Sequence, residues 1–348
     1  MSLREADFSD RIVQWQKTLG RNALPWQNTR DPYRVWLSEI MLQQTQVSTV
    51  LGYYESFLQS FPDVRQLAQA SLDQVLGLWS GLGYYSRARN LHRCAQQVVQ
   101  QHGGEFPRSA QQLQDLPGIG RSTAAAIAAF CFGERVAILD GNVKRVLTRV
   151  LGFSADLSVA ANERALWEQA QRLLPQHALV ENMPRYTQGL MDLGANLCSR
   201  TQPDCAQCPV HAECVAHLAG AAQNYPVKTR KLKRSTESLW LLWAHDNSGA
   251  AWLLRRPDSG VWANLFCLPV FASAEHLHAV LPAHHHGATQ AMPVVRHVLT
   301  HKDLFLHPVR IALPRRAAPT GQGAWFDAGQ WPGLGLPAPI RKLLGTST

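Results

Sequence analysis

Two carboxylates and a group of cysteines are the residues whose types and spacing could do chemistry. Asp140 follows a stretch that opens with Leu116-Pro117-Gly118-Ile119-Gly120 and continues as an Ala-rich segment. Gly118 and Gly120 lack Cβ atoms, so backbone N–H groups in such a turn can approach a phosphate. A helix N-terminus behind the turn adds unpaired N–H donors and the positive end of a dipole. A carboxylate beyond this turn can act on the sugar next to a bound DNA phosphate.

Each carboxylate also has a purely structural explanation. Asp140 precedes an apolar-periodic run, Asn142–Leu151, so it could simply be the N-cap of a helix. On this stretch alone the two interpretations have equal weight. Glu39 lies beside an apolar stripe in the expected helix 33–42, where an exposed glutamate is the default interpretation.

Four of the seven cysteines lie close together with the spacing C-x6-C-x2-C-x5-C. Zinc modules commonly use two short cysteine pairs separated by a longer loop, whereas this pattern has one short pair and two long gaps. Four thiolates can instead hold a cubane iron–sulfur cluster. The spacing therefore predicts a metal site, and favours iron–sulfur over zinc, at Cys198, Cys205, Cys208 and Cys214.

The composition narrows the class of protein. A chain of 348 residues is long enough for two domains, each with its own core. Its net charge of +9, with only 17% charged residues, favours a polyanionic partner. It has neither an N-terminal apolar run of the signal-peptide type nor an apolar run long enough to span a membrane. We therefore expect a soluble intracellular protein without a membrane partner.

The elements that must position these residues change in kind along the chain. Helical periodicity prevails up to Leu197, so the first part is predicted to be all-α. Residues 225–234 carry five basic residues and no acid, which predicts a linker that follows the DNA backbone or is simply solvated. Alternating apolar residues after it predict a separate α+β domain. Its expected elements are a hairpin over 239–254, strands over 294–300 and 304–313, and helices over 274–280 and 339–344.

Two other turns carry side chains suited to nucleic acid. Gln43 opens a polar run, 43–46, that could read bases or simply connect two helices. Tyr84 lies on the turn Gly81–Tyr85, which basic residues follow. An aromatic residue there can wedge between bases, or it can pack on the next helix.

Taken together, these stretches resemble the MutY family of adenine DNA glycosylases, in the helix-hairpin-helix superfamily that also contains endonuclease III. The resemblance runs nearly end to end. It rests, in order, on LPWQ, WLSEIMLQQTQV, GLGYYSRARN, LPGIGRSTAAAI, ILDGNVKRVL, the cysteine group and GVWANLFCLP. It implies an all-α helix-hairpin-helix glycosylase domain with an iron–sulfur cluster loop, followed by an α+β Nudix-like domain. We expect the domains at 1–224, with the cluster loop at 198–214, and at 238–348, joined by the linker 225–237.

The resemblance implies a monofunctional glycosylase of base excision repair that flips adenine out of duplex DNA and hydrolyses its bond to the sugar. Glu39 would be the general acid that protonates N7 of adenine. Asp140 would stabilise the positive charge on the sugar or trap it as a transient ester, with Asn142 orienting Asp140 or the water. Relatives that cleave the strand carry a lysine where this chain has Ser122, so no Schiff base is expected there.

The resemblance also assigns binding residues. Arg21, Leu24, Trp26 and Gln188 would line the adenine pocket. Gly118, Gly120 and Ser122 would hold the DNA. Gln43, Tyr84, Thr300 and His301 would lie near 8-oxoguanine, although Leu299 stands where the family's Phe-Ser-His loop has its aromatic residue.

The expected substrate is therefore double-stranded DNA with adenine opposite 8-oxoguanine or guanine, and the expected cofactor is one [4Fe-4S] cluster. We expect a monomer in the bacterial cytoplasm, associated with the nucleoid. After Gly260 only Glu275 is a nearby acid, so magnesium-dependent nucleotide hydrolysis is not expected. Two alternatives stay open. Ser122 and the Nudix-like domain argue against a pyrimidine-damage glycosylase with lyase activity, and the pair Glu39 and Asp140 argues against a non-catalytic DNA-binding protein.

Overall fold

The computed structural model describes residues 5–230, 233–317, 319 and 321–346. The chain forms two compact units, and several helices pass from one to the other. Lys231 and Leu232 of the basic segment lie outside the described residues. Unit 1 comprises Met1–Tyr54, Asp63–Arg65 and Arg93–Lys231, and unit 2 comprises Glu55–Pro62, Gln66–His92 and Leu232–Thr348.

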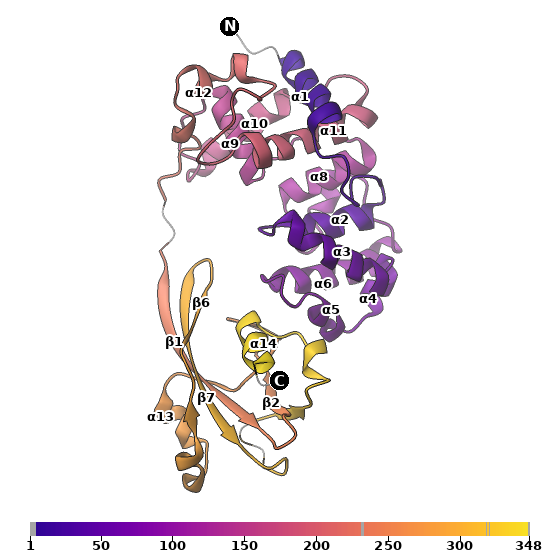
Figure 1. The fold of residues 1–348 in the computed structure, drawn as a ribbon. Coiled ribbons are helices and arrows are strands. Elements are labelled where there is room, and N and C mark those ends of the chain that lie inside the picture. Colours follow the sequence, from indigo (N-terminus) through magenta and orange to yellow (C-terminus); the bar gives the residue numbers. More distant parts are fainter. Residues whose placement is uncertain (1–4, 231–232, 318, 320, 347–348) are drawn as a thin grey trace. The chain divides into compact units, whose positions relative to one another are not determined.

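Unit 1 is helical, and residues 5–230 contain no strand, as the sequence predicted (Figure 1). Its longer helices are α1 (Glu5–Leu19), α2 (Pro32–Leu42), α8 (Arg121–Phe132), α9 (Gly141–Leu151), α10 (Ala160–Arg172) and α11 (Leu179–Asp192). The π-helical turn η1 (Leu193–Leu197), the 3-10 turns η2 (His211–Glu213) and η3 (Ala222–Asn224), and the short helices α7 (Ala110–Leu113) and α12 (Val215–Leu218) complete it. Helices α3 (Val47–Ser60), α4 (Val64–Gln69) and α6 (Ser86–His102) are shared between the units.

The core of unit 1 fixes the two helices that follow the candidate phosphate turn and Asp140. Every residue from Ala124 to Ala129 in α8 is fully buried, because small side chains let neighbouring helices approach closely. The apolar face of α9, with Val143, Val146, Leu147 and Val150, packs into the same core as α1 and α11. Both helices end at a glycine with positive φ, Gly133 and Gly152. The site residues at the N-termini of α8 and α9 are therefore held in place by two firmly packed helices.

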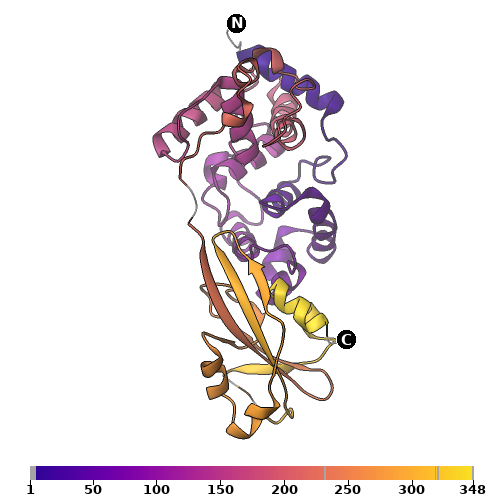
Figure 2. The same cartoon turned by 60° about the vertical axis from the view of Figure 1, so that its left-hand side comes forward.

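Unit 2 is built on an eight-stranded mixed sheet with the order β3-β2-β1-β7-β5, in which β4 pairs with β1, β6 with β7 and β8 with β2. The long strands β1 and β7 lie side by side and pair in parallel over their whole length, as both views show (Figures 1 and 2). The predicted hairpin is confirmed, since β1 and β2 pair antiparallel. The strands are β1 (Ser235–His245), β2 (Ala251–Arg255), β3 (Phe266–Cys267), β4 (Val270–Phe271), β5 (Gln290–Ala291), β6 (Val295–Val298), β7 (Lys302–Ala312) and β8 (Gly323–Phe326).

The helical elements of unit 2 are α5 (Leu72–Leu78), α13 (Ala274–Ala279) and α14 (Ala338–Gly345), with the short turns η4 (Ala283–Ala288) and η5 (Trp331–Gly333). The turn that follows α5 is held by the C-terminal part of the chain. Tyr85 donates its hydroxyl hydrogen bond to the carbonyl of Leu336 at 2.6 Å, and Arg341 Nε donates to Ser80 Oγ at 3.0 Å. These contacts brace the turn that carries Tyr84.

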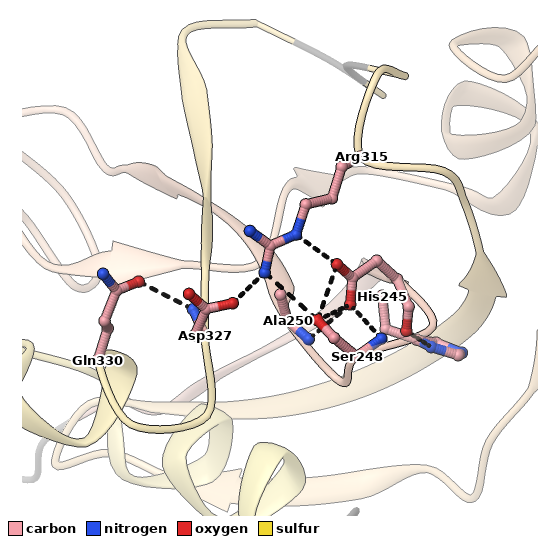
Figure 3. Close-up of polar contacts among 7 residues, drawn as sticks. His245, Ser248, Ala250, Arg315, Asp327 and Gln330 are labelled. Atoms are coloured by element: carbon pink, nitrogen blue, oxygen red, sulfur yellow. Dashed lines mark hydrogen bonds and ion pairs between the residues drawn. The ribbon is translucent and has the colours of Figure 1, made fainter.

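A polar cluster closes the turn between β1 and β2 (Figure 3). The buried carboxylate of Asp246 accepts hydrogen bonds from the backbone N–H groups of Ser248 and Ala250, at 2.8 and 2.9 Å. Arg315 Nε donates to the same carboxylate at 2.5 Å and pairs on its other side with Asp327. These hydrogen bonds and the arginine hold the pKa of Asp246 well below its usual range. The cluster therefore stabilises the turn between β1 and β2 and is not a free acidic site.

Candidate active site

A cavity of about 780 Å³ in unit 1 brings together residues of α2, α11 and the segment after α1. Glu39, Trp26 and Gln188, three of the predicted site residues, line it. Trp26 is buried and its ring packs edge-on against Tyr54, with centroids 5.2 Å apart. The cavity thus has an aromatic side, a carboxyl group and an amide, which suits a flat heterocyclic base.

Glu39 is placed at this cavity by the helix that carries it. Helix α2 begins at Pro32, and Asp31 caps it by accepting the Tyr33 N–H at 2.9 Å. The neighbours of Glu39, Ser38 and Ile40, are buried, and Glu39 itself is half-buried. Burial, together with the negative charge of Asp140, raises the pKa of Glu39 to about 8. At neutral pH Glu39 therefore holds a proton that it can donate.

Asp140 is the N-cap of α9, as one of the two interpretations expected. Its Oδ1 accepts the Val143 N–H at 2.7 Å. Burial raises the pKa of Asp140 above its usual value, while hydrogen bonds from Val143 and Asn142 and the charges of Arg145 and Lys144 act in the opposite direction. The cap fixes the carboxylate in place, and the negative charge of this carboxylate contributes to the raised pKa of Glu39. Capping and catalysis are therefore compatible roles for one side chain.

Asn142 is held by a contact between α9 and η1. A Cβ added to Gly194 would lie 2.7 Å from the Cβ of Asn142, so the glycine permits this close approach. Arg145 NH2 donates to Asn142 Oδ1 at 2.9 Å and to the Gly194 carbonyl at 2.6 Å, and its Nε donates to the Cys198 carbonyl at 2.8 Å. The start of α9 is thereby tied to the cysteine segment.

The candidate phosphate turn is open at its tip. Gly118 has φ +79°, a conformation that L side chains rarely adopt. Gly120 is the N-cap of α8, and a Cβ placed there would meet nothing within 4 Å. Ser122 Oγ accepts the backbone N–H of Leu139 at 3.0 Å, and this hydrogen bond holds the segment that leads to Asp140. Ser122 as a DNA contact stays a prediction, since its hydroxyl hydrogen is still available to donate when the oxygen accepts the Leu139 N–H.

The four clustered cysteines line one small apolar cavity beside the buried Arg149. Arg149 NH1 donates to Cys198 Sγ at 3.2 Å and to the Ser199 carbonyl at 2.7 Å. Burial raises the pKa of Cys208 to about 12. Within the described residues, no group of three or more His, Cys, Asp or Glu side chains could hold a metal ion.

The residues expected near 8-oxoguanine fall in both units. In unit 2 the hydroxyl groups of Tyr84 and Thr300 lie 3.0 Å apart in a hydrogen bond. Tyr84 has φ +48° and is 46% exposed, and Thr300 and His301 are exposed on the turn between β6 and β7. Gln43 belongs to unit 1, where its Nε2 donates to Thr123 Oγ1 at 3.4 Å.

The sequence reasoning missed two polar residues: Gln27, which lines the cavity, and Asp192, which binds the lining residue Gln188. Gln27 accepts the Leu24 N–H at 3.1 Å, while its Nε2 is buried and finds no hydrogen-bond partner among the described residues. Asp192 is fully buried and binds both Arg21 and Gln188. Gln27 could have been found, because it ends the motif LPWQ. For Asp192 the only signal was an acid four residues after Gln188 on a helix.

Family models match both parts of the chain. Residues 37–172 match the HhH-GPD superfamily base excision DNA repair protein model, and residues 239–346 match the NUDIX domain model. The cavity residue Glu39 and the cap Asp140 lie within the first match. No helix in the described part of the chain has the length and apolar character that a membrane crossing requires.

Relatives cover most of the chain. An adenine DNA glycosylase of Buchnera aphidicola (subsp. Acyrthosiphon pisum) is 35% identical over 343 residues, 97% of this chain and 96% of that protein. The human adenine DNA glycosylase is 44% identical over 60% of this chain and 39% of its own length. A thermostable thymine-DNA glycosylase structure matches 62% of this chain and 97% of its own, with 28% identity and a TM-score of 0.54. An endonuclease III–DNA complex, at 18% identity and a TM-score of 0.50, covers 63% of this chain and 99% of its own and shares the fold.

Proposed function

Because this chain belongs to the adenine DNA glycosylase family, we propose that it removes adenine paired with 8-oxoguanine, and also with guanine, from duplex DNA. The chain is a DNA glycosylase, a hydrolase of base excision repair. The observation that carries the proposal is the position of Glu39 at a base-sized cavity, where burial and the charge of Asp140 raise its pKa to about 8.

The reaction that we propose uses the two carboxyl groups in different protonation states. Glu39 donates its proton to N7 of a flipped-out adenine, so the base leaves as a neutral molecule. Asp140, fixed by its hydrogen bond from Val143, faces the positive charge that develops on the sugar. Asn142 orients Asp140 or the attacking water. Burial pushes the pKa of Glu39 upward, which is the shift that an acid catalyst needs near neutral pH.

The test of the proposed function is strand breakage on duplexes with adenine opposite 8-oxoguanine, guanine, cytosine and thymine. We expect breakage only after alkali, because Ser122 offers no amine and its oxygen accepts the Leu139 N–H. Activity should be highest with adenine opposite 8-oxoguanine. Failure to act on adenine in any duplex would contradict the function, and high-yield trapping by borohydride would contradict the argument from Ser122.

The rate should depend on pH through the two carboxyl groups. Glu39 must be protonated, and its pKa is about 8, so single-turnover rates should fall as the pH rises through about 8. Asp140 must be ionised and its pKa is raised, so rates should also fall on the acidic side, at a higher pH than an ordinary aspartate would give. A rate profile that stays flat well above pH 8 would exclude Glu39 as the acid.

We also propose one [4Fe-4S] cluster at Cys198, Cys205, Cys208 and Cys214. The four thiols line one small apolar cavity, and a four-iron cluster takes its thiolate ligands from around such a space. The Arg149 guanidinium beside Cys198 Sγ suits a thiolate ligand. When bound, the cluster would supply structure to the segment that Arg145 ties to Asn142.

Protein purified without exposure to oxygen should be yellow-brown and contain about four irons per chain. Substitution of Cys208 by serine should lower the iron content and destabilise unit 1, whereas Cys94→Ser, at a buried position away from the group, should keep the iron. Iron and zinc are measured by elemental analysis. One zinc per chain without iron would contradict the cluster.

We propose that the chain has domains at 1–224 and 238–348, joined by the linker 225–237. We assign recognition of the opposite base to the residues around Tyr84 and Thr300. The mutual hydrogen bond of Tyr84 and Thr300 supports a joint role. Thr300→Val and Tyr84→Phe should each lower the ratio of rates opposite 8-oxoguanine and opposite guanine, by an amount worth roughly 1–3 kcal/mol. Thr289→Val is the control, because it removes a half-buried hydroxyl of the same unit that, among the described residues, hydrogen-bonds only to the His286 carbonyl. If both variants kept the wild-type ratio of rates, Gln43 would be the residue expected to recognise the opposite base.

The described start of the basic linker runs along the surface of unit 1. Leu157 N donates to the Val227 carbonyl at 3.0 Å, and Asp156 accepts both the backbone and the hydroxyl of Thr229. This pairing leaves Lys228 and Arg230 exposed for phosphate contacts. It supports double-stranded DNA as the partner. We also propose that the protein acts as a monomer in the bacterial cytoplasm, associated with the nucleoid.

A further inference from the structure

We propose that Trp262 is a positioning residue for recognition of the opposite base, because its turn connects the two segments that carry Tyr84 and Thr300. The proposal rests on the proposed function, since it deepens the role assigned to this pair. All the residues concerned belong to unit 2. Trp262 acts through the hydrogen bond between the Tyr84 and Thr300 hydroxyl groups, whose oxygens lie 3.0 Å apart.

The pair of Tyr84 and Thr300 needs support from other parts of unit 2. Both side chains are exposed, and the two residues are 216 positions apart in the chain. An exposed hydrogen bond between two hydroxyl groups contributes little by itself, because water competes for both partners. Tyr84 lies in the turn before α6, and Thr300 lies in the turn between β6 and β7. Other contacts must therefore fix the distance between these two turns.

Residues 260–265 form a turn with an unusual backbone. Trp262 and Asn264 both have φ +61°, a left-handed conformation that is costly for a bulky side chain. The turn is closed by two hydrogen bonds, from the Asn264 N–H to the Pro257 carbonyl at 2.9 Å and from the Leu265 N–H to the Trp262 carbonyl at 3.1 Å. A strained backbone persists only where the surrounding structure fixes it. This turn is therefore a firmly held part of unit 2.

One side of the turn holds the start of α6. Arg89 NH1 donates to the Ala263 carbonyl at 2.9 Å. Arg89 belongs to the first turn of α6, and its backbone N–H donates to the Tyr85 carbonyl at 3.1 Å. Tyr85 directly follows Tyr84. The position of Tyr84 is thereby tied to the backbone of the 260–265 turn.

The other side of the turn packs against β6. The Trp262 ring is buried and lies against the His297 ring, with centroids 6.1 Å apart and planes inclined by 43°. His297 is half-buried on β6, three residues before Thr300. The Leu299 N–H donates to the Lys302 carbonyl at 2.8 Å and closes the turn that carries Thr300. Trp262 therefore holds the end of the strand from which this turn projects.

Loss of the Trp262 ring should affect one partner of the pair more than the other. The contact to Arg89 uses the backbone carbonyl of Ala263 and can persist, whereas the packing on His297 is lost. Thr300 is then less firmly placed against Tyr84. A hydroxyl that is not fixed in advance discriminates less between similar ligands, because ordering it costs part of the binding free energy. Trp262 should therefore influence the preference between opposite bases rather than the cleavage of the bond to adenine.

The first test measures single-turnover removal of adenine opposite 8-oxoguanine and opposite guanine by the full chain. Trp262→Ala should lower the ratio of the two rates about fivefold, within the range that one or two hydrogen bonds supply. Trp262→Phe keeps a ring against His297 and should keep most of the ratio. Trp325→Ala is the matched control and should keep the wild-type ratio, because it removes a half-buried indole that packs edge-on against Trp252 in the same unit.

The ratio separates positioning from a loss of fold. Both rates come from one preparation, so an unfolded fraction lowers them equally and leaves their ratio unchanged. The double variant of Trp262→Ala and Thr300→Val should have the same ratio as Thr300→Val alone, because Trp262 acts through Thr300. Effects on the ratio that multiply in the double variant would overturn the proposal.

The second test needs no DNA. Amide hydrogen exchange at Leu299 reports on the turn between β6 and β7, and exchange at Asp246, whose N–H donates to the Ala250 carbonyl at 3.0 Å, reports on another turn of the sheet. Trp262→Ala should speed exchange at Leu299 and leave Asp246 at the wild-type rate. Trp325→Ala should leave Leu299 at the wild-type rate.

Faster exchange at Leu299 together with a lower ratio of rates would support the proposal. Wild-type exchange at Leu299, or a wild-type ratio, in folded Trp262→Ala would overturn it. If Trp262→Ala does not fold, Trp262→Leu takes its place with the same expected results, since it keeps an apolar side chain without a ring. A wild-type ratio in Thr300→Val would instead contradict the role assigned to the pair under the proposed function.

Discussion

Glu39→Gln is expected to excise adenine about a thousandfold more slowly than the wild type, a loss of about 4 kcal/mol of transition-state stabilisation. The amide has nearly the shape of the carboxyl group but cannot donate a proton to N7, so the base would have to leave as an anion. Binding of the duplex should change little, because the lost interaction matters mainly in the transition state. Single-turnover rates and duplex affinity, measured at one salt concentration, separate these two effects.

Glu105→Gln is the matched control for this variant. It makes the same chemical change at an exposed position of unit 1, and both the rate and the affinity should stay at the wild-type level. A Glu39→Gln variant with a near wild-type rate would show that the raised pKa of Glu39 merely reflects its burial.

Asp140→Asn should also lower the rate by about a thousandfold while the fold keeps its stability. Asparagine caps a helix about as well as aspartate, so the hydrogen bond from Val143 to residue 140 can persist. Asp140→Ala removes the charge and the cap together. It should therefore lose activity and, in addition, about 1 kcal/mol of unfolding free energy. The measurements are single-turnover rates and urea unfolding of both variants.

The Asp140→Asn variant also carries an internal check on the electrostatics. The negative charge of Asp140 contributes to the raised pKa of Glu39, so its removal should lower that pKa. The alkaline limb of the residual activity should then move below pH 8. An Asp140→Asn variant that is fully active would leave capping as the role of this residue.

Local patterns in the sequence were enough to predict the helices that carry the site residues. The Gly118 turn followed by small residues predicted α8, and the N-cap position of Asp140 predicted α9, because turns and caps depend on neighbouring residues. The change from helical to alternating periodicity predicted an α+β part, and the structure has its sheet there. The family motifs, read in order, indicated a glycosylase, and the relatives confirm this.

Only the tertiary structure decided the chemical states and partners of these residues. From sequence alone Glu39 could be an exposed helical acid. In the folded chain it lines the cavity, and burial together with the charge of Asp140 raises its pKa. The choice of Asp192 as the partner of both Arg21 and Gln188, and the parallel pairing of β1 with β7, also required the folded chain. Burial, charge coupling and strand partners depend on residues far apart in sequence, which local patterns do not specify.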